Sequence, residues 1–509
     1  MTRPSFADSH NPSPTPQPPV VLWPAHTRTE PPLPPTQTPD AHRTATLFLA
    51  ALALYFAAHT ALRALAGGGL EVDEAEMLVL ARGWHLGYGP QLPLYNWLQV
   101  AAFDLFGHTA FALAALKNLV LFTAMALLFT GLRRVVPVTL AIAATLSFAL
   151  IPNIVWEFQR ASTHSIALLA TVTATIAAVL AVVDPARRTG WGTGVALGLA
   201  MGLGGLAKFN SWLVPVSLGI AVMSDPSLRA RVRMGPVLGA VVVTMLIVAV
   251  PYTWVWQHPG VALASTAKLY QADGNALLGV GRAVGGFALG AVPLAVAALA
   301  FRGTGAVPWP ATLLLRAAGI GFMLTLTGII LGGVTVVQAR WLVPIYALLG
   351  PGVMIWAVRA AGPLGLRRLM GVTVAIGVLT LGGMANLRLH GKTTGGIDWA
   401  PLAEEVMTLT QGVVPVLADD HVGGNLIYQQ PEIRVISPDG RGAALAPARV
   451  LLVWKGDVMP DPAEALAARG LQVTGRIVVE NQGQRALGYR AAAGTTFPVG
   501  WALIATDAP

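Results

Sequence analysis

Long apolar segments separated by short polar loops run from residue 47 to residue 386 of the chain. Eleven such segments can be distinguished. They cover residues 47–65, 109–131, 135–151, 165–183, 192–206, 211–223, 235–256, 283–301, 312–337, 341–358 and 370–386. A helix needs roughly 20 apolar residues to cross a bilayer, so this pattern predicts about eleven transmembrane helices. The fifth and sixth segments are short, and the stretch Lys208-Phe-Asn210 between them predicts a break between two half-length helices.

The chain changes character on the N-terminal side of this region. Residues 1–44 are rich in proline, serine, threonine and glutamine and hold too little apolar surface to fold, so we expect a disordered tail there. No small-residue cleavage site precedes the first apolar segment, which we therefore expect to remain as a membrane anchor. Residues 45–387 form the predicted transmembrane domain.

The C-terminal region at 388–509 is more polar and alternates short helix and strand patterns. Helical patterns cover residues 402–409, 422–428 and 462–468, and strand patterns cover residues 413–417, 434–436, 450–454, 473–479 and 486–489. Such a mixture is typical of a small α/β domain. The predicted fold class is therefore an α-helical polytopic membrane protein with a small C-terminal α/β domain.

Composition supports this fold class. Hydrophobic residues make up 54% of the 509 residues and charged residues 11%, which excludes a soluble globular protein of this length. The formal net charge of +9 could indicate a nucleic-acid partner, but the basic residues sit in short loops between apolar segments, so we expect no nucleic-acid binding. The absence of cysteine excludes disulfides, a thiolate nucleophile and cysteine metal ligands.

The basic residues also predict how the chain is oriented. Arginines recur in every second loop between the apolar segments. They are Arg133, Arg134, Arg187, Arg188, Arg229, Arg231, Arg233, Arg302, Arg359, Arg367 and Arg368. By the positive-inside rule these loops are cytoplasmic. The rule predicts a multi-pass protein of the cytoplasmic (inner) membrane, surrounded by membrane lipids, with a cytoplasmic N-terminal tail and an extracytoplasmic C-terminal domain.

Four carboxylates lie within Glu71-Val-Asp-Glu-Ala-Glu76, just after the first apolar segment. Carboxylates are costly near hydrocarbon, so an acidic cluster at the membrane boundary indicates a functional site. The outer loop at 66–108 also holds two amphipathic stretches separated by a turn with glycine and proline, which predicts helices at the interface. The alternative is a solvated loop end in which Asp73 caps a helix.

The same loop resembles that of a known family. The segment from Asp73-Glu-Ala75 through Gly87-Tyr88 to Pro93-Leu-Tyr-Asn-Trp97 is similar to the first loop of membrane glycosyltransferases with the GT-C fold, and most of all to the protein O-mannosyltransferase and lipid A aminoarabinose transferase superfamily. The resemblance extends to the many apolar segments and the C-terminal region. It implies transfer of a sugar from a polyprenyl-phosphate carrier to a glycan, lipid or protein acceptor on the outer face of the membrane, without a cofactor.

The resemblance implies roles for individual residues. Asp73 aligns with the family's catalytic acidic position and is the expected general base, because a hydroxyl acceptor loses its proton as it attacks the anomeric carbon. Glu74 is expected to support the site or to hold a metal or the acceptor, and Glu71 and Glu76 are weaker candidates. Family members carry a His or Lys before a Pro-Pro pair where this chain has Gly89-Pro-Gln-Leu-Pro93, so the lipid phosphate is left to other basic residues.

The expected phosphate ligands are basic residues near the outer boundary. Lys117, Lys208 and Arg340 each stand in a sequence context similar to that of a basic residue in the family, and Arg82 is a weaker candidate. A lipid phosphate departs as an anion, which such cations stabilise. For each of these residues the alternative is anchoring at the membrane interface.

Four further polar residues of the outer loops are expected to bind the acceptor or support the site. They are Glu157, His164, His85 and Tyr88. For Glu157 the alternative is an ion pair with Arg160. The acidic run and His85 also offer ligands to a divalent metal, but their spacing matches no metalloenzyme signature, so we expect no metal requirement.

Two other functions remain open. A lipid-linked-sugar transporter or flippase would also have many spans and an ionisable residue such as Lys117 within one of them. Against it, the two halves of the chain show no inverted repeat, and the ionisable residues cluster at the outer boundary. The second alternative is a non-catalytic relative that binds a polyprenyl lipid. The sugar and the acceptor cannot be read from the sequence.

Overall fold

The computed structural model describes residue 2 and residues 39–186, 189–301, 305–359, 361, 363–437, 444–473 and 475–506. The disordered tail expected at 1–44 lies outside the described residues up to residue 38, apart from residue 2. Helix α1 (Pro39–Ala66) includes the last residues of that expected tail, so it is longer than the apolar segment at 47–65. The described residues from 39 onward form one compact unit.

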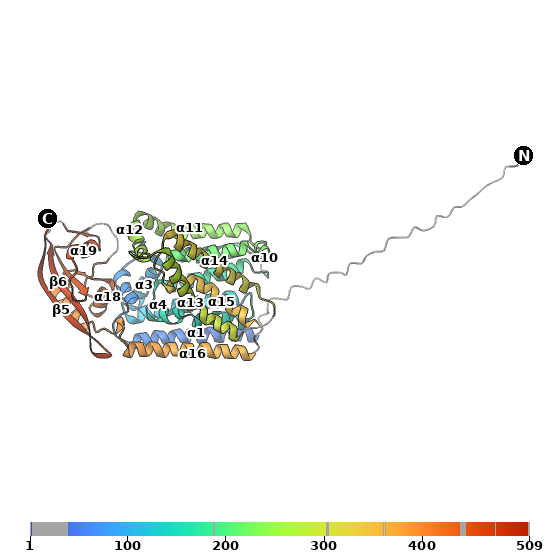
Figure 1. The fold of residues 1–509 in the computed structure, drawn as a ribbon, viewed down its shortest axis with the longest axis horizontal. Coiled ribbons are helices and arrows are strands. Elements are labelled where there is room, and N and C mark those ends of the chain that lie inside the picture. The colour runs from blue at the N-terminus through green and yellow to red at the C-terminus, as the bar shows by residue number, and fades with distance from the viewer. Residues whose placement is uncertain are drawn as a thin grey trace. The chain divides into compact units, whose positions relative to one another are not determined.

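Most of the described residues are helical, and eight of the described helices are long and apolar enough to cross a membrane. They are α1, α4 (Ala110–Leu132), α7 (His164–Val182), α11 (Met234–Gln257), α13 (Ala276–Ala300), α14 (Trp309–Gly332), α15 (Val343–Val358) with the short helix η5 (Ala339–Leu342) before it, and α16 (Pro363–His390). Each coincides with a predicted segment, and α1 and α16 run side by side (Figure 1). The predicted polytopic helical fold is confirmed.

Three predicted segments take bent or shorter forms. The segment at 135–151 opens a pair of helical stretches, Val138–Leu150 and Asn153–Arg160, that meet at 78°. These stretches consist of α5 (Val138–Leu146), η1 (Ser147–Leu150), η2 (Asn153–Glu157) and α6 (Phe158–Arg160). Counted as one span, the pair raises the candidates to nine among the described residues.

The predicted break at Lys208 is confirmed. Helix α8 (Trp191–Ala207) ends there because Lys208 adopts an extended backbone with φ −159° and ψ 148°. The short helix η3 (Phe209–Trp212) and α9 (Leu213–Met223) follow. Both α8 and α9 are apolar but shorter than a full span, so their crossing of the membrane stays a prediction.

Two predicted boundaries differ from the structure because helix caps rather than hydropathy set them. The segment at 312–337 stops being helical at Gly332, since Gly333 takes a left-handed conformation with φ 62°. The segment at 283–301 is helical from Ala276, where the Asn275 side chain accepts a 3.0 Å hydrogen bond from the Leu278 N–H.

The loop between α1 and α4 contains two helices, as predicted. Helix α2 (Val72–Leu80) carries the acidic run, and α3 (Pro93–Phe106) follows a turn closed by a bridge between Tyr88 and Gln91. Proline suits the first position of α3, because the backbone N–H that it lacks has no partner within a helix. Other connections contain the short helices α10 (Pro226–Arg229), α12 (Pro259–Ala262) and η4 (Ala264–Leu269).

The chain beyond α16 forms a small α/β assembly. It contains η6 (Thr394–Gly396), α17 (Ala400–Thr410), β1 (Val416–Leu417), α18 (Asp420–Gln429), β2 (Ala444–Leu445), β3 (Arg449–Lys455), α19 (Pro462–Ala467), β4 (Leu471–Gln472), β5 (Ile477–Tyr489) and β6 (Ala492–Thr506). One sheet has the order β1-β3-β6-β5, in which only β1 and β3 are parallel, and β2 pairs with β4. Helix α18 packs against α2, which joins this assembly to the acidic run.

The strand predictions in this region need correction. Of the predicted strand at 473–479 only residues 477–479 are in a strand, and together with the predicted strand at 486–489 they belong to one long strand, β5, which pairs with β6 in a hairpin (Figure 1). The predicted strand at 434–436 is reduced to a bridge between Val416 and Val435. Most side chains of β5 are exposed, so its sequence lacks the apolar alternation that marks a half-buried strand.

Candidate active site

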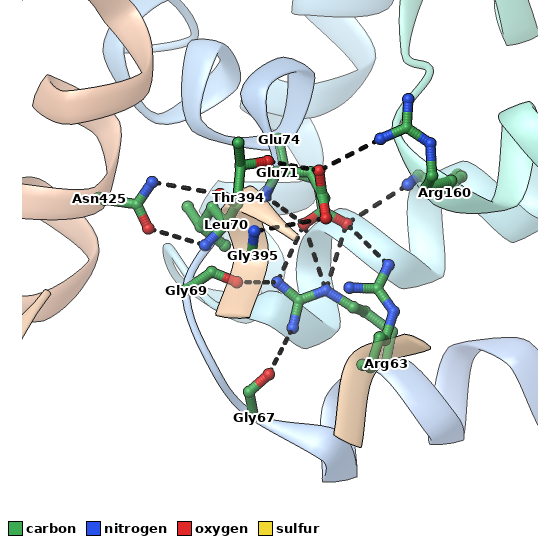
Figure 2. A network of polar contacts seen from close by, with 12 residues as sticks. Arg63, Gly67, Gly69, Leu70, Glu71, Glu74, Arg160, Thr394, Gly395 and Asn425 are labelled. Carbon is green, nitrogen blue, oxygen red and sulfur yellow. Dashed lines mark hydrogen bonds and ion pairs between the residues drawn. The ribbon is translucent and has the colours of Figure 1, made fainter. Parts of the chain in front are cut away.

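Helix α2 presents its carboxylates on two faces. A helix turns by about 100° per residue, so residues three apart share a face and adjacent residues do not. The N-cap residue Glu71 and Glu74 therefore point one way, and Asp73 and Glu76 point another. Figure 2 shows Glu71 and Glu74 together, directed at arginines and at the residues Thr394 and Gly395.

Three cations surround Glu74. Its carboxylate lies 2.9 Å from Nη2 of Arg63, 3.3 Å from Nζ of Lys117 and 3.7 Å from Nη2 of Arg388. Burial alone would raise the pKa of Glu74, but Arg63, Lys117 and Arg388 hold it well below its usual range. The Glu74 side chain is fully buried, so it remains an ionised partner of these cations and does not face a substrate.

Glu71 is held by the C-terminal assembly and by one arginine. Its carboxylate accepts hydrogen bonds from the Thr394 hydroxyl at 2.6 Å and from the Gly395 N–H at 3.3 Å (Figure 2). Arg160 reaches it at 3.5 Å and also pairs with Glu157 at 3.0 Å. The ion pair between Glu157 and Arg160 that the sequence left as an alternative is thus confirmed.

Asp73 lies on the other face of α2 and is only partly exposed. Among the described residues, none donates a hydrogen bond to its carboxylate or forms an ion pair with it. Burial raises its pKa above the ordinary value, although Arg340, Lys117 and Lys208 oppose that rise. A carboxylate that is near cations, unbonded and more basic than usual can accept a proton from a substrate.

Glu76 shares the face of Asp73. It accepts a 3.2 Å hydrogen bond from Nε2 of Gln91. Burial and the nearby carboxylates of Asp73 and Asp420 raise the pKa of Glu76 to about 8. Glu76 is therefore largely protonated at neutral pH, which reduces the repulsion that an ionised Asp73 meets.

Three of the predicted cations, Arg340, Lys117 and Lys208, lie within electrostatic range of Asp73, and of these Lys117 pairs with Glu74. Nζ of Lys208 donates to Oγ of Ser165 at 2.9 Å, and Nε of Arg340 donates to Oε1 of Gln338 at 2.7 Å. Both interact electrostatically with Asp73 and with each other, and Lys268 also lies within electrostatic range of Lys208. Neither bond partner is charged, so both positive charges remain available to an anion.

The remaining predicted residues lie elsewhere. Lys117 faces Glu74, and Arg82, near the end of α2, donates from Nε to the Leu78 carbonyl at 3.2 Å. His164 is buried, with Nε2 2.5 Å from Oδ1 of Asn96 and Nδ1 3.2 Å from the Thr163 hydroxyl. Its two ring nitrogens are therefore used within the protein.

His85 and Tyr88 stabilise the turn between α2 and α3. The Tyr88 hydroxyl donates to the Gly83 carbonyl at 2.5 Å and accepts from the His85 N–H at 3.0 Å. Nε1 of Trp97 donates to the His85 carbonyl at 2.7 Å. These contacts give the turn a defined shape beside the acidic run.

Sequence reasoning missed Arg63, Arg388, Thr394 and Asn425. Arg63 had a usable signal, because an ionisable residue within a membrane span indicates a buried partner or a site. Thr394 and Asn425 had none, because they contact residues 71 and 70, respectively, from 323 and 355 positions further along the chain. No group of three or more His, Asp or Glu residues in the described chain is placed to hold a metal ion, and metal independence stays a prediction.

Known sequences are similar to this chain over most of its length. A family model for dolichyl-phosphate-mannose-protein mannosyltransferases matches residues 89–256, a range that includes Lys117 and Lys208 but not Asp73. The chain is 30% identical to the lipopolysaccharide core galacturonosyltransferase RgtA of Rhizobium johnstonii, over 91% of this chain and 97% of that protein. It is 29% identical to RgtB of the same organism, over 85% and 92%.

Two crystal structures of ArnT from Cupriavidus metallidurans share the fold. The apo structure gives a TM-score of 0.58 at 16% identity, over 91% of this chain and 98% of that one. The structure bound to undecaprenyl phosphate gives a TM-score of 0.56 at 17% identity, over 90% and 97%. With the identity to RgtA and the helical architecture, these matches show that the chain belongs to the membrane glycosyltransferases of the GT-C fold.

Proposed function

We propose that this glycosyltransferase moves a sugar from a polyprenyl-phosphate carrier to an acceptor on the outer face of the cytoplasmic membrane, with Asp73 as the general base. The observation that carries the proposal is a carboxylate, Asp73, that has no hydrogen bond or ion pair within the described residues and lies within electrostatic range of two cations, Lys208 and Arg340. The carboxylate can take a proton, and the cations can stabilise a leaving anion. Arginine in every second loop supports the outer location of α2.

The proposed step is a displacement at the anomeric carbon of the donor sugar. An acceptor hydroxyl attacks that carbon, and its proton passes to an oxygen of Asp73. The bond from the anomeric carbon to the phosphate oxygen breaks as the glycosidic bond forms, and the lipid phosphate leaves with the electron pair. Lys208 and Arg340 stabilise the negative charge on that phosphate. The raised pKa of Asp73 strengthens it as a base.

For the substrates we propose galacturonic acid as the sugar and a lipopolysaccharide core as the acceptor. The support is the identity to RgtA, a protein named for this activity. Lys268, close to Lys208, adds a third cation, which suits a donor that carries negative charge on both its phosphate and its sugar carboxylate.

A lipid carrier also needs apolar space in the protein. A cavity of 570 Å³ lies between α1, α4, α5 and α16 and is lined almost entirely by apolar side chains. It supports a lipid substrate, as does the fold shared with ArnT bound to undecaprenyl phosphate. In this proposal Glu74, Lys117, Glu157 and His164 support the structure, His85 and Tyr88 shape the loop, and no metal takes part.

The test uses cells that lack this gene, complemented with the wild type, Asp73→Asn or the control Asp104→Asn. Asp104 is an exposed carboxylate on α3. In the deletion cells, mass spectrometry should show that polyprenyl-phosphate-linked galacturonic acid accumulates and that the lipopolysaccharide core lacks this sugar. Wild type and Asp104→Asn should return the carrier pool and the core to normal, and Asp73→Asn should change neither.

Assays with purified protein then measure how far the substitution at Asp73 lowers kcat. Loss of a general base lowers kcat by roughly 10²- to 10⁴-fold, which is the fall we expect for Asp73→Asn. Full rescue by Asp73→Asn would show that another group takes the proton. An unchanged pool of lipid-linked sugars in the deletion strain would instead favour transport or lipid binding over transfer.

A further inference from the structure

The C-terminal assembly holds the backbone that leads into α2. The Leu70 N–H donates to Oδ1 of Asn425 at 2.7 Å, and Nδ2 of Asn425 donates to the Leu70 carbonyl at 3.2 Å (Figure 2). The same Nδ2 donates to the His421 carbonyl at 2.9 Å. Leu70 and Asn425 are both fully buried. The Asn425 amide is therefore fixed by its partners and fixes the Leu70 backbone in turn.

The next residue along the chain is held as well. Glu71, the N-cap of α2, binds Thr394 and Gly395 through its carboxylate. Two successive residues at the start of α2 are thus tied to α18 and η6. The helix cannot shift along its axis or turn without breaking these contacts.

Helix α18 also approaches α2 closely. A Cβ atom at Gly424 would lie 2.1 Å from the Ala75 carbonyl oxygen, and one at Gly69 would lie 3.0 Å from Oδ1 of Asn425. Real Cβ atoms do not approach other atoms at the first distance, so the packing of α18 on α2 needs glycine at 424. The C-terminal assembly therefore sets the distance to α2 as well as the position of its first turn.

The cations of the proposed site come from a different part of the chain. Lys208 lies between α8 and η3, and Arg340 lies in η5. The separation between Asp73 and these cations therefore depends on where α2 is held. A misplacement of about 1 Å can lower a reaction rate by roughly 100-fold.

We propose that Asn425 is a positioning residue for sugar transfer: by fixing Leu70, it holds α2 so that Asp73 stands correctly between the acceptor hydroxyl and the cations Lys208 and Arg340. The inference rests on the proposed function, because it takes Asp73 as the base. The C-terminal α/β assembly then affects the rate of the chemical step through the position of α2.

The test compares full-length wild type, Asn425→Ala, Asp73→Asn and the control Asn481→Ala, an exposed asparagine on β5. Transfer is assayed with undecaprenyl-phosphate-linked galacturonic acid and lipopolysaccharide core, per folded enzyme. Hydrogen exchange of residues 70–80 is followed by mass spectrometry in the same preparations. A second variant, Thr394→Val, removes the single hydroxyl that donates to Glu71, in case Asn425→Ala does not fold.

We expect Asn425→Ala to lower kcat by roughly 10- to 100-fold, with the donor KM changed less than about twofold. The acidic limb of the kcat–pH profile should move, since Asp73 changes its surroundings, and exchange in α2 should become faster. Thr394→Val should change the same quantities by less, and Asn481→Ala should match the wild type. A purely structural role would lower the yield of folded enzyme and leave the pH profile and kcat per folded enzyme unchanged.

The positioning role is overturned if folded Asn425→Ala, or Thr394→Val in its place, keeps both the wild-type pH profile and the wild-type exchange of α2. Asp73→Asn separates this result from failure of the proposed function. If Asp73→Asn is inactive while Asn425→Ala is normal, only the positioning role is wrong. If Asp73→Asn is active, or the wild type does not transfer this sugar, the proposed function is wrong, and the exchange data still decide whether Asn425 holds α2.

Discussion

The Glu74 carboxylate accepts a 2.9 Å hydrogen bond from Nη2 of Arg63, and neither side chain reaches solvent. Arg63 lies near the end of α1, and its guanidinium also donates hydrogen bonds to the carbonyls of Gly67 and Gly69. The pair of Arg63 and Glu74 therefore holds the start of α2 against the end of α1. The neighbouring residue, Asp73, has no such partner in the part of the chain that the structure describes.

Glu74→Gln should destabilise the protein strongly. The change keeps the shape of the side chain but removes the one negative charge that Arg63, Lys117 and Arg388 share. Breaking a buried ion pair in this way costs about 3–5 kcal/mol. Thermal unfolding in detergent should show a clear fall in the melting temperature. Glu404→Gln, at an exposed position on α17, is the matched control and should melt like the wild type.

Stability should fall as the pH rises from about 4.5 to about 8, and Glu76 should account for part of that fall. The pKa of Glu76 is raised from 4.5 to about 8, so between these values the folded state binds more protons than the unfolded state. Stability therefore decreases across this window and levels off above it. In Glu76→Gln the decrease should be smaller when melting temperatures are measured at several pH values. Equal pH dependence in variant and wild type would contradict the assignment.

Lys208→Met and Lys117→Met should separate substrate binding from structure. Lys208 lies within electrostatic range of Asp73 and is proposed to bind the donor phosphate, so its loss should lower kcat/KM for the lipid-linked donor by about 10- to 100-fold, the range for a charged hydrogen bond. Lys117 faces Glu74, so its loss should lower the melting temperature and change kcat/KM per folded enzyme much less. The opposite ranking would place the donor phosphate on the Glu74 side of α2.

Gly424→Ala should disturb the contact between α18 and α2. The added methyl group would meet the Ala75 carbonyl oxygen at 2.1 Å, so the two helices must separate. Overpacking of this kind costs about 1–3 kcal/mol, and here it should also lower the rate of transfer. Gly488→Ala is the control, because nothing lies within 4 Å of a Cβ there. Wild-type stability and rate in Gly424→Ala would show that α18 can move without consequence.

The spans were predictable because hydropathy is a property of each segment by itself. Each of the eleven apolar segments became helical, and the break at Lys208 was visible as a polar interruption. The hairpin of β5 and β6 was not predictable, since β5 is an edge strand with mostly exposed side chains. A strand of that kind is fixed by its partner and not by its own pattern.

The site was partly predictable for a related reason. A short acidic run next to a predicted span indicates where a functional site lies, and helical spacing then puts Asp73 and Glu76 on the same face of a helix. Which face of α2 meets which cations depends on α16, α4 and η5, which lie far away in the sequence. Lys117 was therefore expected at the phosphate, whereas its charge is directed at Glu74.

The two faces of α2 make the role of a carboxylate depend on its phase along the helix. Replacing Asp73 by Glu would keep that phase. A single residue inserted between Glu71 and Asp73 would turn every later side chain by about 100° and take Glu74 away from Arg63. Relatives with equally acidic loops but a different spacing would then lack either the buried anchor or the free base. The spacing of the run, more than its acidity, is the feature by which an active member should be recognised.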